Sequence, residues 1–190
     1  MTDKPSYLGL LNAIANAETD AECYLGGWAA ATDRDDVRRV IATVALREGE
    51  HGKAFAKRIC ELGFELHRKE AADIADKCDI ACSTELSDRE KFERLGLVRS
   101  ADADQPDIFS GMFNDKSIDI QTGTLLGRYI AEERDSGRMF RACHEQLCCE
   151  EEMSSNGSGA KSGSGKKARL AALEGRMGGI EAKLDQLLAR

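Results

Sequence analysis

The chain has 190 residues, of which 42% are hydrophobic and 32% are charged, and its formal net charge is −7. These values predict one globular domain of ordinary size with an appendage, and they argue against a chain that is disordered throughout. No apolar run is long enough to span a membrane, and residues 1–5 lack the apolar core of a signal peptide, so we expect a cytoplasmic protein without membrane partners. The seven cysteines follow no common zinc or redox spacing, and we expect free thiols.

The charge is unevenly distributed along the chain. From Ser154 onward there are seven lysines or arginines and three acidic residues, so this tail carries about +4 and the preceding residues about −11. An acidic body argues against nucleic-acid binding and is compatible with attracting cations.

The first two predicted helices carry charged residues in the middle of their apolar faces. Residues 6–31 form the first helical pattern, with Glu18 and Glu22 on its apolar face. The break at 32–36 contains aspartates, one of which we expect to cap the next helix. The second helix runs over 37–62 and ends at Gly63. Its apolar face contains the following residues: Val37, Ile41, Val44, Glu48, His51, Phe55, Ile59 and Leu62.

A short loop between two long helices predicts an antiparallel hairpin, in which the midpoints of the helices meet. Glu18 would then lie beside Glu48 and His51, which are one helical turn apart. Buried carboxylates and an imidazole need partners, and a metal ion supplies one. We therefore predict that Glu18, Glu48 and His51 are metal ligands. The alternative is a polar interruption satisfied by neighbouring side chains, or a helix rotated to place both Glu48 and His51 in water.

The middle of the chain, residues 64–117, predicts short helices within a crossover connection. Residues 69–81 have a helical pattern, and Ser87 with Glu90 forms a capping box that opens a short helix. A polar loop over 101–107 and an apolar group over 109–113 follow.

A long helical pattern returns from Ile118 to about Glu150. Here Glu133 and Ser136 have the spacing of Glu48 and His51, and a glycine, a basic residue and a phenylalanine follow at matching positions. The match indicates a weak internal repeat that has lost its second histidine, although chance similarity of short motifs is the competing explanation. We predict Glu133 as a fourth ligand, with Glu132 as its competitor if the helical register differs by one residue.

Other candidates have weaker claims to the site. Glu22 is a ligand or pairs with Arg47, and Glu85 is the nearest candidate for a ligand from the middle region. We expect His144 to be structural or at the surface, His67 to be solvated, and the rings of Tyr24 and Tyr129 to fill the core.

The sequence after residue 150 predicts a linker followed by a helix. Residues 151–167 are rich in Gly and Ser, which predicts a flexible linker after a bundle over 1–150. Residues 168–190 carry apolar residues at alternating spacings of three and four, which predicts a coiled-coil helix for oligomerisation or partner binding.

Glu18, followed by Glu48-x-x-His51 on a second helix, resembles the ferritin-like superfamily of ferritins, bacterioferritins and rubrerythrins. The resemblance covers residues 6–65 and, in part, 118–150. It implies an all-α, antiparallel ferritin-like helical bundle, with a C-terminal coiled-coil helix added here, and iron held by Glu18, Glu48, His51 and Glu133. Ser136 stands where the family's second Glu-x-x-His motif has its histidine, and the third-helix glutamate lacks a clear counterpart.

The resemblance implies oxidation of Fe(II) by dioxygen or peroxide, for iron storage or protection against oxidative stress, in a homo-oligomer. The sequence leaves open whether the chain is an enzyme, as a ferroxidase or a peroxidase-type di-iron oxidoreductase. One alternative is a metal-free scaffold that acts through its coiled coil as an interaction module. Another is a di-iron enzyme that oxidises an organic substrate.

Overall fold

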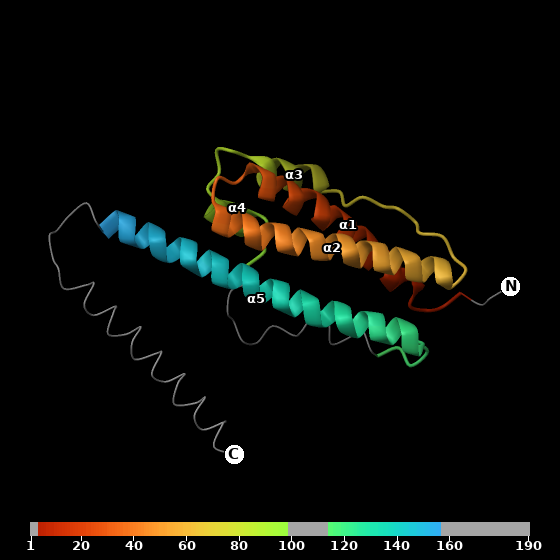
Figure 1. Ribbon diagram of the computed structural model, residues 1–190. Helices are drawn as coiled ribbons and strands as arrows, with labels where there is room; N and C mark the ends of the chain where they lie inside the picture. Colours follow the sequence, from red (N-terminus) through yellow and green to blue (C-terminus); the bar gives the residue numbers. More distant parts are fainter. Residues whose placement is uncertain (1–3, 99–113, 157–190) are drawn as a thin grey trace, which may run out of the picture. The chain divides into compact units, whose positions relative to one another are not determined.

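The computed structural model describes residues 4–98 and 114–156, and every regular element in these ranges is a helix (Figure 1). In chain order the helices are α1 (Leu8–Ala31), α2 (Asp35–Glu61), α3 (Ile74–Cys82), α4 (Asp88–Arg94) and α5 (Ile120–Asn156). The prediction of an all-helical protein is confirmed at this level. None of the described helices is long and apolar enough to cross a membrane.

Helices α1 and α2 form the predicted hairpin. The turn between them is short because α1 ends at Ala31 and α2 begins at Asp35. At the other end of α2, Gly63 has a φ of 84°, and the amides of Gly63 and Phe64 donate to the carbonyls of Cys60 and Ile59. This is the Schellman arrangement, in which a glycine adopts the left-handed conformation that other residues disfavour.

The expected aspartate cap at the start of α2 is wrong. Arg34 is the N-cap residue and makes no side-chain cap bond, while Asp35 and Asp36 lie in the first turn. The carboxylate of Asp36 accepts hydrogen bonds from the Arg34 guanidinium instead. Both aspartates still interact favourably with the positive end of the helix dipole.

The segment after α2 runs back along α1 and is tied to it by polar side chains. Asn16 donates to the carbonyl of His67 and accepts from the amide of Lys69. The carboxylate of Asp20 accepts from Arg68 and from the amide of Ala71. These bonds satisfy the backbone of an irregular segment, and α3 then packs on α1 over a shorter range than the 69–81 that the pattern predicts.

Helix α4 begins with the capping box that the sequence predicts. The Ser87 hydroxyl accepts from the Glu90 amide, and the Glu90 carboxylate accepts from the Ser87 amide. Behind it, Asp88 accepts from the indole of Trp28 at 2.6 Å and from the hydroxyl of Thr32 at 2.7 Å. These bonds join α4 to the end of α1.

The start of α5 is fixed to α2 by Arg58. This largely buried side chain donates to the hydroxyl of Thr122 at 2.9 Å and to Asp119 at 2.9 Å. Tyr7 also donates to Asp119. The helix continues to Asn156, six residues beyond the predicted end of the bundle. The chain divides after Cys149 into two units, and the site described below lies within the first. Four predictions lie outside the described residues: the coiled-coil helix, most of the linker, the polar loop over 101–107 and the apolar group over 109–113.

Within the described ranges, the core of the first unit contains two apolar clusters. One cluster contains Trp28, Ile41, Phe92 and Phe140, and the other contains Leu11, Phe55, Ile59 and Leu126. Along α1, α2 and α5 alike, the polar residues of the site fall between the members of one cluster and those of the other. The site is therefore a polar layer between two apolar layers.

Candidate metal centre

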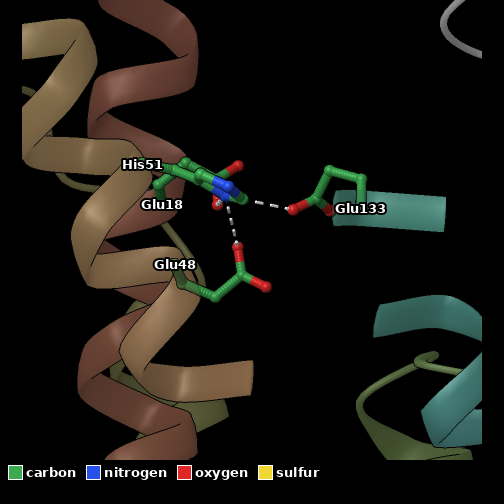
Figure 2. Close-up of side chains that lie close together, drawn as sticks. All are labelled: Glu18, Glu48, His51 and Glu133. Atoms are coloured by element: carbon green, nitrogen blue, oxygen red, sulfur yellow. Dashed lines mark ion pairs between the residues drawn. The ribbon is translucent and has the colours of Figure 1, made fainter. Parts of the chain in front are cut away.

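Three helices bring four predicted ligands together in this polar layer. Glu18 comes from α1, Glu48 and His51 from α2, and Glu133 from α5, as Figure 2 shows. Each residue offers one ligand atom, and these atoms all lie within 4.8 Å of one another. Glu18, Glu48 and His51 are buried, with 6%, 5% and 3% of their surfaces exposed.

Local helix geometry explains how these side chains meet. Glu48 and His51 are three residues apart on α2, so both project from one face toward α5. Glu18 faces them because α1 and α2 pack tightly at this level. A Cβ atom on Gly52 would come within 2.9 Å of the Thr19 hydroxyl, so glycine allows the close approach of the helices beside the cluster.

His51 directs one ring nitrogen to the cluster and the other away from it. Nδ1 lies 3.4 Å from Glu133 Oε1, 3.8 Å from Glu18 Oε2 and 3.9 Å from Glu48 Oε2. Nε2 is bonded to Glu132 Oε2 at 2.6 Å. A metal-binding histidine usually donates its other N–H to a carboxylate, which fixes the tautomer and the ring orientation. Glu132 meets this requirement.

Three buried atoms of the cluster have no hydrogen-bond partner in the described part of the chain. They are Glu18 Oε2, His51 Nδ1 and Glu133 Oε1, and all three face one another. Leaving a buried polar atom unpaired costs about 1–3 kcal/mol, and more if the group is charged. An ion at their common centre would satisfy all three at once.

The cluster also perturbs its own protonation equilibria. Burial and the neighbouring Glu18 carboxylate raise the pKa of Glu48 to about 9. Burial opposes the charging of His51, but the surrounding carboxylates outweigh it and raise the pKa of His51 to about 12. Burial also disfavours an ionised Glu18, yet contacts with His51, Glu48 and Tyr129 lower its pKa. Near neutral pH the metal-free cluster thus holds protons on Glu48 and His51, where a cation would otherwise supply the positive charge.

Tyr129 closes one end of the polar layer. Its hydroxyl donates to Glu18 Oε1 at 2.9 Å, and its ring packs edge-on against His51 and Phe55. We expected this ring to fill the core, and it is indeed buried, but its hydroxyl also orients a predicted ligand. Burial raises the pKa of Tyr129, so the phenol remains neutral.

The weaker candidates lie apart from the four-residue cluster. Glu22 pairs with Lys53 at 3.3 Å, and the predicted pairing with Arg47 is wrong. Glu85 and His67 are exposed. His144 is partly buried beside Phe92 and Cys148, which agrees with the structural role expected for it.

The surroundings of Ser136 were not predicted from the sequence. This serine is buried, and its hydroxyl accepts from Arg47 Nη1 at 3.3 Å, while the same nitrogen donates to Asp135 at 2.8 Å. Glu132 and Glu133 were expected to be alternatives, but each contacts a different ring nitrogen of His51, Glu132 at Nε2 and Glu133 at Nδ1. The adjacent acids Glu132 and Glu133 are visible in the sequence, and two neighbouring carboxylates on one helix can each contact a different nitrogen of the same histidine ring.

No known protein family, curated protein or solved structure matches the chain. The fold and the site by themselves define an all-helical protein with a buried cluster of three glutamates and one histidine. This cluster could hold a metal ion. The donor set fits such an ion because carboxylate oxygens and an imidazole nitrogen are the common ligands of divalent transition metals.

Proposed function

We propose that this chain is a ferritin-like iron-binding protein, which binds Fe(II) at Glu18, Glu48, His51 and Glu133 and oxidises it with dioxygen or peroxide. The observation that carries the proposal is a set of three mutually facing buried atoms, on Glu18, His51 and Glu133, that have no hydrogen-bond partner among the described residues. The His51 nitrogen lies 3.4 Å and 3.8 Å from the two carboxylate oxygens, too far for a good hydrogen bond to either. A structural polar network would be expected to satisfy its own members, since unsatisfied buried groups are costly. These groups have the arrangement expected of ligands.

Iron is proposed because of the chemistry of the donors. Three carboxylates favour hard cations, and they stabilise Fe(III) more than Fe(II), which assists oxidation. With peroxide as the oxidant, two Fe(II), one hydrogen peroxide and two protons give two Fe(III) and two waters. The acidic body of the chain would attract the cationic substrate. The outcome would be storage of ferric iron or removal of the oxidant.

The residues around the ligands have supporting roles in this proposal. Glu132 holds the His51 ring so that Nδ1 faces the centre. Tyr129 fixes one oxygen of Glu18 and leaves the other free to bind. The apolar clusters on either side limit access of water, which strengthens electrostatic interactions within the layer.

The test is anaerobic loading of the full-length protein with Fe(II), followed by desalting, elemental analysis and optical spectra recorded as air is admitted. We expect retained iron and a growing ferric absorbance in the near ultraviolet. His51→Ala should lose both, whereas His67→Ala, a matched change at an exposed histidine, should lose neither.

Absence of retained iron in the unaltered protein would overturn the proposal and favour the metal-free scaffold. Equal retention by the His51→Ala and His67→Ala variants would place the iron elsewhere in the chain. If iron is retained but the spectrum does not change in air or peroxide, the proposed iron binding stands and the proposed oxidation of Fe(II) is refuted.

A further inference from the structure

The polar layer is closed beyond Glu133 by a cation of the protein itself. Ser136 lies one turn after Glu133 and therefore continues the same face of α5. Its hydroxyl accepts a hydrogen bond from the guanidinium of Arg47, which is one turn before His51 on α2. The next residue on this face of α5 after Glu133 is thus Ser136, whose neutral hydroxyl oxygen already accepts a hydrogen bond from the positively charged Arg47.

Arg47 is held in this position by more than one contact. Its Nη1 donates to Asp135 Oδ2 at 2.8 Å and approaches the sulfur of Met139 at 3.7 Å. Its side chain is 28% exposed. A hydrogen bond between charged groups is about twice as strong as a neutral one, which favours this single placement.

Among the residues that the structure describes, the other sides of the cluster offer few further donors. Tyr129 closes the end toward the second apolar cluster with an aromatic ring and a neutral phenol. The Nε2 atom of His51 and the carboxylate of Glu132 are bonded to each other. Glu22, one turn beyond Glu18, is directed to Lys53.

We infer that the centre holds one divalent cation per chain and that Arg47 excludes a second. This inference rests on the proposed metal-binding function. Two metal ions that share carboxylates lie roughly 3.5–4 Å apart and need donors on both sides. A second ion displaced toward Ser136 would meet the Arg47 guanidinium, and one displaced toward Tyr129 would meet the ring. Like charges repel strongly in a partly dehydrated layer, so neither place suits a cation.

A single-ion centre has a consequence for the proposed chemistry. One Fe(II) releases one electron when it becomes Fe(III), so the first filling would convert one hydrogen peroxide and one proton to water and a hydroxyl radical. A second Fe(II), with a second proton, would then reduce that radical to water. The overall balance of two Fe(II) and two protons per peroxide is unchanged.

The first test is the stoichiometry of the full-length protein, measured by elemental analysis and by anaerobic titration with Fe(II), with Co(II) as a probe that resists oxidation by air. We expect about one ion per chain, bound through the four cluster residues. About two ions per chain, or one ion per two chains, would overturn the inference while leaving metal binding intact. No bound ion would overturn both the inference and the proposed function.

The second test changes the charge at Arg47. The double variant Ser136→His, Arg47→Met gains an imidazole donor at position 136 and loses the guanidinium at position 47. We expect its metal occupancy to rise toward two ions per chain. Arg47→Lys in the same Ser136→His background keeps the positive charge and should remain near one. Arg138→Met is the matched control, because Arg138 also pairs with Asp135, at 3.0 Å, but is 64% exposed.

Circular dichroism of each variant establishes that it is folded before its occupancy is compared. Occupancy that stays near one in a folded Ser136→His, Arg47→Met protein would refute the role assigned to Arg47. If that variant does not fold, Arg47→Met alone is compared with Arg47→Lys by competition with a chelator. We then expect the Arg47→Met variant, and not the Arg47→Lys variant, to bind a second Co(II). Equal binding of a second Co(II) by the two variants would refute the inference.

Discussion

Replacing Glu48 with glutamine should stabilise the metal-free protein while it weakens metal binding. Glu48 is 5% exposed, and its pKa is raised from 4.5 to about 9. At pH 7 the folded protein must therefore keep a proton on a carboxyl that is ionised in the unfolded chain. A glutamine has nearly the same shape and carries its amide hydrogens at every pH.

The size of the effect follows from proton linkage. Holding the proton costs about 1.4 kcal/mol for each pH unit above the unfolded pKa, hence roughly 3 kcal/mol at pH 7 for a pKa of 4.5. The raised pKa means that the contribution of Glu48 to stability is fully present below pH 4.5 and declines as the pH rises toward 9. Because the amide fits the site imperfectly, we expect Glu48→Gln to raise the free energy of unfolding by roughly 2 kcal/mol at pH 7.

The assay is urea unfolding of chelator-treated protein at pH 5, 7 and 8, followed by circular dichroism. The advantage of the variant should grow by about 1.4 kcal/mol per pH unit over this range. Glu50→Gln is the control, because Glu50 is on the same helix but its side chain is 69% exposed, and it should change stability by less than about 0.5 kcal/mol.

Destabilisation of the metal-free protein by Glu48→Gln at pH 7 would contradict the proposed protonation of Glu48, and so would an advantage that did not depend on pH. Such a result would mean that Glu48 is ionised in the folded protein and is paired more favourably than its surroundings indicate. The same variant should bind Co(II) more weakly, because a neutral amide is a poorer ligand than a carboxylate.

Two further predictions concern proton release and the packing of α4. Binding of one Co(II) at pH 7 should release about two protons, from Glu48 and His51, so affinity should rise with pH. Calorimetry in buffers of different ionisation enthalpy measures this number, and release of no protons would contradict the assigned protonation. Asp88→Ala should lower the free energy of unfolding by about 2–3 kcal/mol, because it leaves the Trp28 indole and the Thr32 hydroxyl without their acceptor. Asp76→Ala, at an exposed position of α3, is the control in urea unfolding, and equal effects of the two changes would refute the role of Asp88.

The amino-acid sequence determined the helices whose signals are local. The apolar periodicity of α1 and α2 defined their inward faces, and the capping box at Ser87 and the glycine at position 63 marked helix ends. The central positions of Glu18, Glu48 and His51 followed from the antiparallel hairpin, because its loop is short and the two helices have similar lengths. Local rules failed at the start of α2, where Arg34 binds Asp36 and no aspartate caps the helix.

The tertiary structure alone decided how α5 completes the site. Glu133 lies more than eighty residues after His51 in the chain. The helical pattern predicted Glu133 as a ligand, but it did not show that Glu132 also contacts the ring. Packing against the two apolar clusters sets the rotation of α5, and this rotation places Glu133 on one side of His51 and Glu132 on the other. It also brings Arg47 to Ser136, where the sequence showed only a missing histidine. A contact between distant helices depends on the packing of the whole core, whereas helical periodicity depends on neighbouring residues only.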